Sequence, residues 1–156
     1  MTQTEELTPY ELFGTYRHIG IVVRDIDAYG RTLKEMFGYE PSGFGETPPD
    51  ETRRYKGEYE DFKARMAFYN LEGTMLELLM PIQGKNVWQD YLDEKGEGIH
   101  HLNFDVIHYD KAVAHLTDLG LPIVMSGTSF RRPGCRWCYV DAREKIGMYL
   151  EIAELP

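Results

Sequence analysis

Hydrophobic and polar positions follow the same order in two separate parts of the chain. Residues 17–37 align with residues 100–119, and each segment reads as a short strand, a turn, an amphipathic helix and a glycine at which the helix ends. An aspartate stands near each expected helix start, Asp27 in the first copy and Asp110 in the second, where a carboxylate can cap free backbone N–H groups. The chain is therefore predicted to contain a duplicated βα unit.

Alternating apolar and polar residues after each helix predict three further strands in each copy. In the first copy they cover residues 39–45, 64–70 and 74–80, and in the second copy residues 122–125, 136–141 and 148–152. Each half is then a βαβββ module, the first spanning residues 14–82 and the second residues 97–155. The predicted fold class is α+β.

The remaining segments connect or flank these modules. Residues 83–96 form a linker, in which residues 86–95 predict a short amphipathic helix. Residues 1–13 are expected to be an N-terminal arm or a single helix turn, which leaves residues 14–155 as one domain. The stretch from Glu46 to Asp61, with two prolines and many charges, predicts an irregular loop over one rim of the sheet.

Charge and hydropathy limit the classes of partner. The 156 residues include 17 Lys and Arg against 26 Asp and Glu, and the formal charge of −9 disfavours nucleic acid and anionic membrane surfaces. No apolar run approaches the roughly 20 residues that cross a bilayer, and the first residues lack a basic segment followed by an apolar one. A cytoplasmic protein is expected.

Two cysteines occur as Cys135 and Cys138, a spacing found in redox pairs and in half of a zinc site. The segment reads as a strand, in which residues three apart point to opposite faces. The sequence favours two ordinary reduced thiols.

Four polar side chains lie on strand faces opposite to the apolar residues that cover the helices. His18 lies opposite the face of Ile19, Ile21 and Val23, and the same alternation places Glu77, His101 and Glu151 on the inner face of three other strands. An ionised carboxylate inside a sheet is costly unless it is paired or bound to a metal. The set is a candidate site for one divalent ion, zinc, nickel, cobalt or manganese, with coordination positions left for a chelating substrate.

Taken singly, each of these residues has an ordinary structural explanation, as a satisfied histidine or as a strand-end glutamate that reaches solvent. The repeat strengthens the metal interpretation because it places His18 over His101. Glu77 follows His18 by 59 residues and Glu151 follows His101 by 50, and the longer loop of the first half accounts for most of the difference. His100 aligns with Arg17 and is expected to face outward.

Four segments resemble the vicinal oxygen chelate superfamily, which includes glyoxalase I, methylmalonyl-CoA epimerase, extradiol dioxygenases and bleomycin-resistance proteins. They are HIGIVV at 18–23, LELLMP at 76–81, GEGIHHLNFDV at 96–106 and YLEIAE at 149–154. The resemblance implies that the two modules curve into one open barrel around a metal site. It also places the family's four metal positions on His18, Glu77, His101 and Glu151.

The resemblance further separates the possible activities. Extradiol dioxygenases have histidine at the position of Glu77, and bleomycin-resistance proteins generally lack a complete ligand set, so both are disfavoured alternatives. Glyoxalase I, a lyase, shares this kind of quartet but would need a glutathione site that the sequence does not indicate. The epimerases use an acidic loop residue that has no clear match in residues 46–61. The first expectation is a metal-dependent isomerase or epimerase that forms an enolate, with Glu151 as the first candidate base and Glu77 as the second.

Candidate substrate contacts lie beside the predicted metal site. Arg131 and Arg132, together with Arg136, have no acid among them and could hold a carboxylate or phosphate, although a solvated hairpin turn is an equally good explanation. Asn103 shares the inner face with His101, and the aromatic residues Tyr139 and Tyr149 are expected to line the pocket, whereas Trp88 and Trp137 are expected to pack. The predicted partner is a small carbonyl compound, either neutral or anionic. We expect a homodimer, with modules that pair within one chain or swap between two.

Overall fold

The structure is a computed structural model that describes residues 6–156; residues 1–5 of the expected arm lie outside this range. Its helices are α1 (Pro9–Leu12), α2 (Ile26–Phe37), α3 (Val87–Lys95), α4 (Tyr109–Asp118) and α5 (Arg143–Ile146). Its strands are β1 (Tyr16–Val22), β2 (Gly43–Glu46), β3 (Arg54–Tyr55), β4 (Glu58–Tyr59), β5 (Lys63–Leu71), β6 (Thr74–Gln83), β7 (Gly98–Val106), β8 (Ile123–Thr128), β9 (Arg136–Asp141) and β10 (Tyr149–Glu154).

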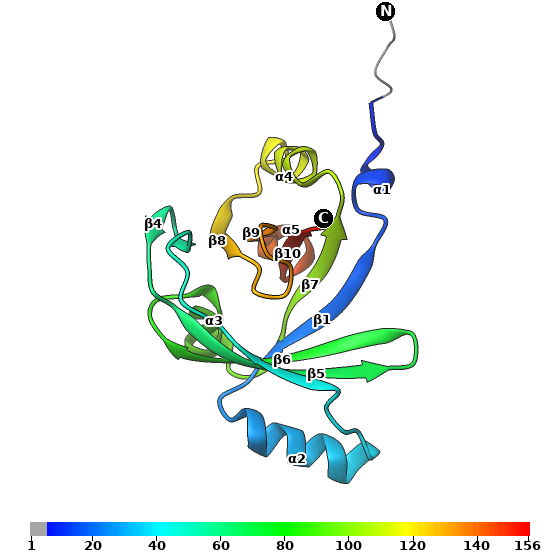
Figure 1. The fold of residues 1–156 in the computed structure, drawn as a ribbon, viewed down its shortest axis with the longest axis vertical. Helices are drawn as coiled ribbons and strands as arrows, with labels where there is room; N and C mark the ends of the chain where they lie inside the picture. Colours follow the sequence, from blue (N-terminus) through cyan, green and yellow to red (C-terminus); the bar gives the residue numbers. More distant parts are fainter. Residues whose placement is uncertain (1–5) are drawn as a thin grey trace, which may run out of the picture.

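All the strands form one curled mixed sheet in the order β2-β5-β6-β1-β7-β10-β9-β8-β3-β4. Each half contains one parallel pair, β1 with β6 and β7 with β10, and the two halves join where β1 runs antiparallel to β7. Figure 1 shows α2 and α4 at opposite ends of the molecule, α2 against β5 and β6 and α4 against β10. The α+β fold with a half-barrel sheet is confirmed, and in the described chain β1 of the first half pairs with β7 of the second.

The helix caps differ from the prediction. The side chain of Asp25 caps α2 by accepting a hydrogen bond of 2.9 Å from the backbone N–H of Ala28, so Asp27 lies in the first turn instead. His108 precedes α4 and makes no side-chain capping bond to the described residues, while the carboxylate of Asp110 pairs with Arg136. Both helices begin earlier than expected because the turns after β1 and β7 are short.

The segment 46–61 is more regular than predicted. Its centre forms the hairpin of β3 and β4, and β3 pairs with β8 of the other half. The turn between the two strands is Lys56-Gly57, and both residues have positive φ, 49° and 85°, as a tight hairpin turn requires. Strands of two residues carry no periodic signal, which explains why the sequence did not reveal them.

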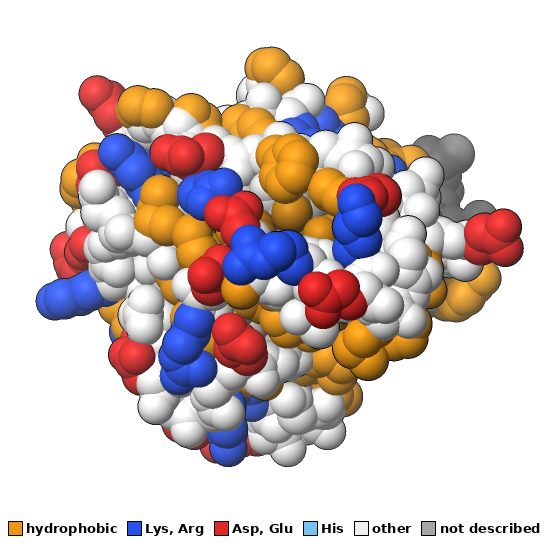
Figure 2. All heavy atoms as spheres, turned by 90° about the horizontal axis from the view of Figure 1, so that it is seen from below, with side chains coloured by type: hydrophobic (Ala, Val, Ile, Leu, Met, Phe, Trp, Pro, Cys, Tyr) orange, Lys and Arg blue, Asp and Glu red, His pale blue; other side chains and the backbone are white. Residues whose placement is uncertain are grey.

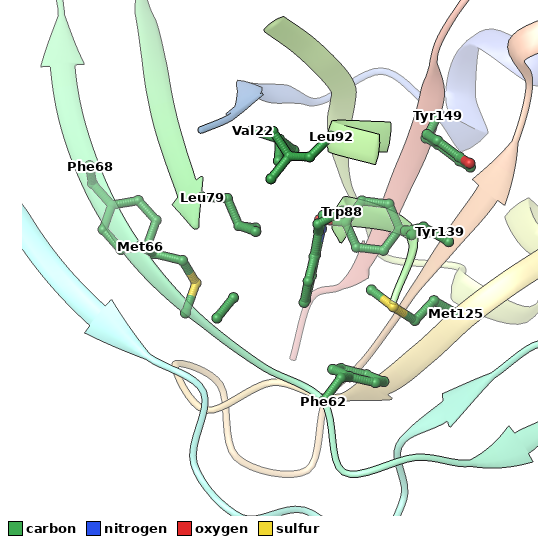
Figure 3. Close-up of a cluster of buried hydrophobic side chains, with 12 residues drawn as sticks. Val22, Phe62, Met66, Phe68, Leu79, Trp88, Leu92, Met125, Tyr139 and Tyr149 are labelled. Carbon is green, nitrogen blue, oxygen red and sulfur yellow. The ribbon is translucent and has the colours of Figure 1, made fainter. Parts of the chain in front are cut away.

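Three hydrophobic clusters hold the layers together. Ile26 and Leu33 of α2 pack with Leu78, and Ala112 and Leu116 of α4 belong to a second cluster on the outer side of β7, β9 and β10. The third cluster lies inside the curled sheet under α3 and includes several aromatic rings (Figure 3): Phe62, Phe68, Trp88, Tyr139 and Tyr149. The inner surface of the sheet is therefore part of a core as well as the place where polar side chains meet. The thiols of Cys135 and Cys138 are free and buried.

The outer surface mixes charges of both signs. On the face drawn in Figure 2, Lys and Arg side chains lie beside Asp and Glu side chains, with apolar groups between them. Within residues 6–156, the helices are all too short or too polar to cross a membrane.

Candidate metal centre

Four neighbouring strands each bring one histidine or glutamate to the same point inside the curled sheet. Glu77 comes from β6, His18 from β1, His101 from β7 and Glu151 from β10, and these strands are adjacent in the order β6-β1-β7-β10. One ligand atom from each residue lies within 4.8 Å of the other three. The side chains singled out in the sequence are therefore brought together by the topology.

The distances between the four atoms suit a cation at their centre. His18 Nε2 lies 3.0 Å from Glu77 Oε2, 3.2 Å from His101 Nε2 and 3.3 Å from Glu151 Oε2. His101 Nε2 lies 3.3 Å from each of the two carboxylate oxygens. Two ligands held at about 2.0–2.1 Å from one ion, at right or tetrahedral angles, are roughly 2.8–3.4 Å apart. The group can enclose an ion without large rearrangement.

The electrostatics of the group also favour a positive charge. Burial opposes protonation of His18, but the carboxylates of Glu77 and Glu151 outweigh it and raise the pKa of this imidazole to about 10. Burial alone would raise the carboxyl pKa values, yet the facing imidazoles hold the pKa of both Glu77 and Glu151 below the ordinary value. Within residues 6–156, the Oε2 atoms of both glutamates face the two imidazole nitrogens, but no donor N–H or O–H points at them with hydrogen-bond geometry. Two ionised carboxylates with unused lone pairs are what a divalent cation requires.

A glycine makes room for His101. Gly20 of β1 lies directly opposite His101 of β7, and a Cβ atom built on Gly20 would lie only 1.9 Å from Cε1 of the imidazole. The ring therefore occupies the space that any other residue at position 20 would fill. This close approach allows the ring of His101, which is completely buried, to reach the ligand group.

His100 is buried, contrary to the expectation that it faces outward. The pairing of β1 with β7 matches Gly20 to His101 and Ile21 to Ile99, so His100 is an extra residue in β7, a β-bulge. The bulge interrupts the alternation of faces, and the Nδ1 atoms of His100 and His101 come within 3.0 Å of each other. The ring of His100 also stacks on Tyr149 at 4.6 Å.

This contact orients His101 for ligation. His100 Nε2 lies 3.3 Å from the carbonyl oxygen of Val87, which can only accept, so this nitrogen carries the proton. Burial lowers the pKa of His100 well below its ordinary value, and its Nδ1 is then an acceptor. His101 then donates from Nδ1. Although burial opposes protonation of His101, the carboxylates of Glu151 and Glu77 raise its pKa. A bound metal would take the place of the proton on Nε2, and a second hydrogen bond at Nδ1 is the arrangement that commonly fixes a ligating imidazole.

The ligand group opens into a cavity of about 110 Å³. His18, Glu77 and Glu151 lie in its wall, and His101 is enclosed behind them. Tyr139 lines the cavity as expected, but Tyr149 stacks on His100 instead. Trp88 and Trp137, expected to serve only in packing, also line it, because α3 and β9 turn these rings toward the interior (Figure 3 shows Trp88).

The predicted arginine cluster divides into different environments. Arg131 and Arg132 both line the cavity. Arg131 stacks on Phe68, with its Cζ 3.9 Å from the ring centre, whereas Arg132 donates two hydrogen bonds to Asp105. Arg136 was grouped with them in error, since it pairs with acids on the outside of the second half, Asp110 and Glu154.

Asn103 lies in the cavity wall, where its side-chain N–H is 3.4 Å from the backbone carbonyl of Glu151. Sequence reasoning missed Arg53, which also lines the cavity and is 1% exposed. Arg53 did not stand out in the sequence because residues 50–65 contain equal numbers of basic and acidic residues, so that their charges cancel. The signal that could have revealed it is the pair of opposite charges, Arg53 and Asp61, on either side of the Lys56-Gly57 turn.

Comparison with known proteins agrees with this geometry. Over 95 residues the chain is 24% identical to the uncharacterized protein YqjC of Bacillus subtilis (strain 168). This match covers 61% of this chain and 68% of YqjC. The structure is similar to methylmalonyl-CoA epimerase from Mycobacterium tuberculosis, with a TM-score of 0.67, 21% identity and coverage of 100% of this chain and 93% of the other. A Streptomyces coelicolor methylmalonyl-CoA epimerase variant in complex with 2-nitronate-propionyl-CoA gives a TM-score of 0.64 at 20% identity, covering 90% and 93% of the two chains.

At these identities the solved structures establish the likeness of fold. The family is established by sequence, since the model of the Glyoxalase/Bleomycin resistance protein/Dioxygenase superfamily matches residues 17–139. That range contains three of the four converging residues, His18, Glu77 and His101. The chain is a member of the Glyoxalase/Bleomycin resistance protein/Dioxygenase superfamily.

Proposed function

We propose that this protein is a divalent-metal-dependent isomerase or epimerase that acts on a carbonyl compound with an adjacent oxygen, through an enolate. The observation that carries the proposal is the convergence of two imidazoles and two carboxylates, from four strands, at the wall of one cavity. The methylmalonyl-CoA epimerases among the structural neighbours support the same class of reaction.

His18, Glu77, His101 and Glu151 would hold one divalent ion. Mixed imidazole and carboxylate ligands accept zinc, nickel, cobalt or manganese, so the donor set does not select among them. When bound, the ion supplies a Lewis acid for the negative charge that develops on the substrate oxygens.

The protein's own groups must move the proton. Glu151 is the first candidate base because its side chain is 16% exposed, against 7% for Glu77, and because the imidazoles lower its pKa and keep it ionised. Removal of a proton beside the carbonyl produces an enolate. Glu151 then carries the proton that it has removed and releases it to solvent. Glu77, which faces the same cavity and is itself ionised, takes up a proton from solvent before it delivers that proton to the enolate. If a proton is added to the original carbon from the opposite side, the product is an epimer. If it is added to the adjacent carbon, the product is an isomer.

A separate acidic base is not needed in this scheme. The carboxylates that line the cavity within the described chain are Glu77, Glu151 and Asp105. Asp105 is held by Arg132 through both of its oxygens, so it is unsuited to exchange protons with a substrate. The acidic loop residue that the epimerases use has no counterpart in this cavity wall, and the two predicted ligands carry the proton transfer.

Metal content is the first test. We expect purified protein incubated with manganese, nickel, cobalt or zinc to retain about one equivalent after desalting, measured by elemental analysis. The variants Glu77→Ala and His101→Ala should retain much less. Equal metal content in wild type and both variants would contradict the proposed ligands.

Proton exchange is the second test. Metal-loaded protein in D₂O should introduce deuterium next to the carbonyl of a substrate within a panel of 2-hydroxy ketones, 2-keto acids and acyl-CoA thioesters. Loss of a leaving group would identify a lyase of the glyoxalase I type, and oxygen consumption with ferrous iron and catechols would identify a dioxygenase. Ligand binding that survives chelator treatment, without exchange, would identify a binding protein. Homodimerisation and a cytoplasmic location stay predictions from the sequence.

A further inference from the structure

The cavity contains more unpaired polar groups than the metal site explains. Five buried side-chain atoms lack a hydrogen-bond partner within the described residues, and every one belongs to a residue that lines this cavity: Arg53 Nη2, Glu77 Oε2, Trp88 Nε1, Asn103 Oδ1 and Glu151 Oε2. The glutamate oxygens belong to the candidate metal centre. Arg53, Trp88 and Asn103 have no part in it.

We propose that Arg53 binds a carboxylate of the substrate, at a position remote from the oxygens that chelate the metal. The substrate would then be a carbonyl compound that also carries a free carboxylate. This inference rests on the proposed function, because it names the substrate class of the same cavity.

Arg53 is buried without full compensation of its charge. Its Nη1 donates to Asp61 Oδ1 at 2.9 Å and to the carbonyl oxygen of Phe62 at 2.8 Å. The side chain of Asp61 is 47% exposed, so solvent weakens its attraction for the guanidinium. A buried charge with an unused donor destabilises the folded protein, and an anion brought by the ligand would supply the missing acceptor.

The surroundings of Arg53 suit a carboxylate. The guanidinium lies 5.5 Å from the ring centre of Phe62, and Trp88 meets the same ring edge to face at 5.6 Å (Figure 3 shows Phe62 and Trp88). The unused Nη2–H of Arg53 offers a charged donor to a carboxylate oxygen in a wall that is otherwise partly aromatic.

Other basic residues are less suited to this role. Arg132 is already paired with Asp105, and Arg131 is exposed at the mouth of the cavity on Phe68. Among residues 6–156, Arg53 is the one Lys or Arg that is buried. An anion bound there loses its water, and this increases the strength of the charged hydrogen bond.

Binding of matched probes tests the proposal. Manganese-loaded protein is titrated calorimetrically with malonate, succinate and glutarate, with the corresponding monoamides, and with inorganic phosphate. We expect one dicarboxylate to bind about tenfold to a hundredfold more tightly than its monoamide, since a hydrogen bond to a charged group has about this effect. Arg53→Gln should remove that preference and leave the affinity for the monoamide unchanged. The neighbouring Arg54→Gln is the matched control, because Arg54 packs over Tyr59, and it should keep the preference.

Asp61→Asn gives an independent readout if Arg53→Gln does not fold. Removing the carboxylate partner of Nη1 leaves Arg53 with more unbalanced charge, so dicarboxylate affinity should rise several-fold. A purely structural role for the Arg53 to Asp61 pair predicts weaker binding instead. Equal affinity for dicarboxylate and monoamide, or an Arg53-dependent preference for phosphate alone, would overturn the proposal.

The outcomes also separate this inference from the proposed function. Normal manganese binding and deuterium exchange, without any Arg53-dependent preference for a carboxylate, overturn the inference alone. Failure of the wild type to bind metal overturns the proposed function. In that case the same probes on metal-free protein still decide whether Arg53 recognises an anion.

Discussion

His18 and His101 occupy equivalent positions in the two halves of the chain, but the residues across from them differ. Gly20 lies opposite His101, and Asn103 lies opposite His18. Because Gly20 has no Cβ, the ring of His101 packs directly against β1, where it is fully buried. His18, in contrast, is 8% exposed and lines the cavity. Duplication supplies the same type of ligand twice, and one small residue decides which copy is enclosed.

The exposure of the two glutamates follows the opposite pattern to that of the two histidines. Glu77, in the first half, is the less exposed carboxylate, and Glu151, in the second half, is the more exposed one. The two accessible members of the group, His18 and Glu151, thus come from different halves and lie 3.3 Å apart. A single module would supply only one of them. The site therefore requires both modules, arranged around the junction of β1 and β7.

The difference between the glutamates leads to the largest expected effect. Glu151→Gln should lower the rate of deuterium exchange about 10²–10⁴-fold, because an amide cannot accept the substrate proton. Glu77→Gln should weaken metal binding while retaining most of the exchange rate at saturating metal. Single-turnover exchange measured with excess manganese compares the two variants. A larger rate loss in Glu77→Gln than in Glu151→Gln would mean that Glu77, rather than Glu151, is the base.

The difference between the histidines gives the second prediction. A four-ligand structural zinc site binds with about 10–16 kcal/mol, so one imidazole accounts for roughly 3–4 kcal/mol, or several hundredfold in affinity. His18→Ala and His101→Ala should both show a loss of this order in metal titrations. Added imidazole should restore binding to His18→Ala, since this position faces the cavity, and should fail with His101→Ala. Equal rescue of both variants would show that His101 is less enclosed than its surroundings indicate.

The sequence predicted the convergence of these side chains better than their surroundings. Strand alternation and the internal repeat were enough to place His18 and Glu77 on inner faces, because those features depend on local periodicity. The β-bulge at His100 was invisible, since it arises from the register between β1 and β7. Arg53 was missed for a related reason, because its burial depends on a hairpin of two-residue strands that dock on the other half.

The enclosure of His101 can be tested directly at the glycine. Gly20→Ala should destabilise the protein by about 1–3 kcal/mol, the usual effect of overpacking, and should weaken metal binding by displacing the imidazole. Gly43→Ala is the matched control, since a Cβ there would meet nothing within 4 Å and the backbone needs no positive φ. Urea unfolding and metal titration of both variants provide the comparison. A Gly20→Ala variant as stable as Gly43→Ala would mean that the ring of His101 lies elsewhere.

The smallest expected effect concerns the ion pairs that attach each helix to its own half. In the second half, Arg136 bonds to Glu154 of β10 and to Asp110 of α4 at 2.9 Å, whereas in the first half Arg65 approaches Asp27 only to 3.6 Å. Hydrogen bonds from Arg136 lower the pKa of Glu154 from 4.5 to about 2. Because the folded-state value is depressed, the contribution of Glu154 is fully present above pH 4.5 and disappears as the pH falls toward 2.

These pairs are partly exposed, so the contribution of Glu154 should stay below about 1 kcal/mol. Glu154→Gln should therefore be slightly less stable than wild type at pH 7, and the difference should be much smaller at pH 2.5, close to the folded-state pKa, when urea unfolding is measured at both pH values. Asp27→Asn should have no measurable effect at either pH, because the longer and more exposed pair with Arg65 adds little. A Glu154→Gln difference that does not change with pH would show that packing of this side chain, rather than its charge, attaches β10 to α4.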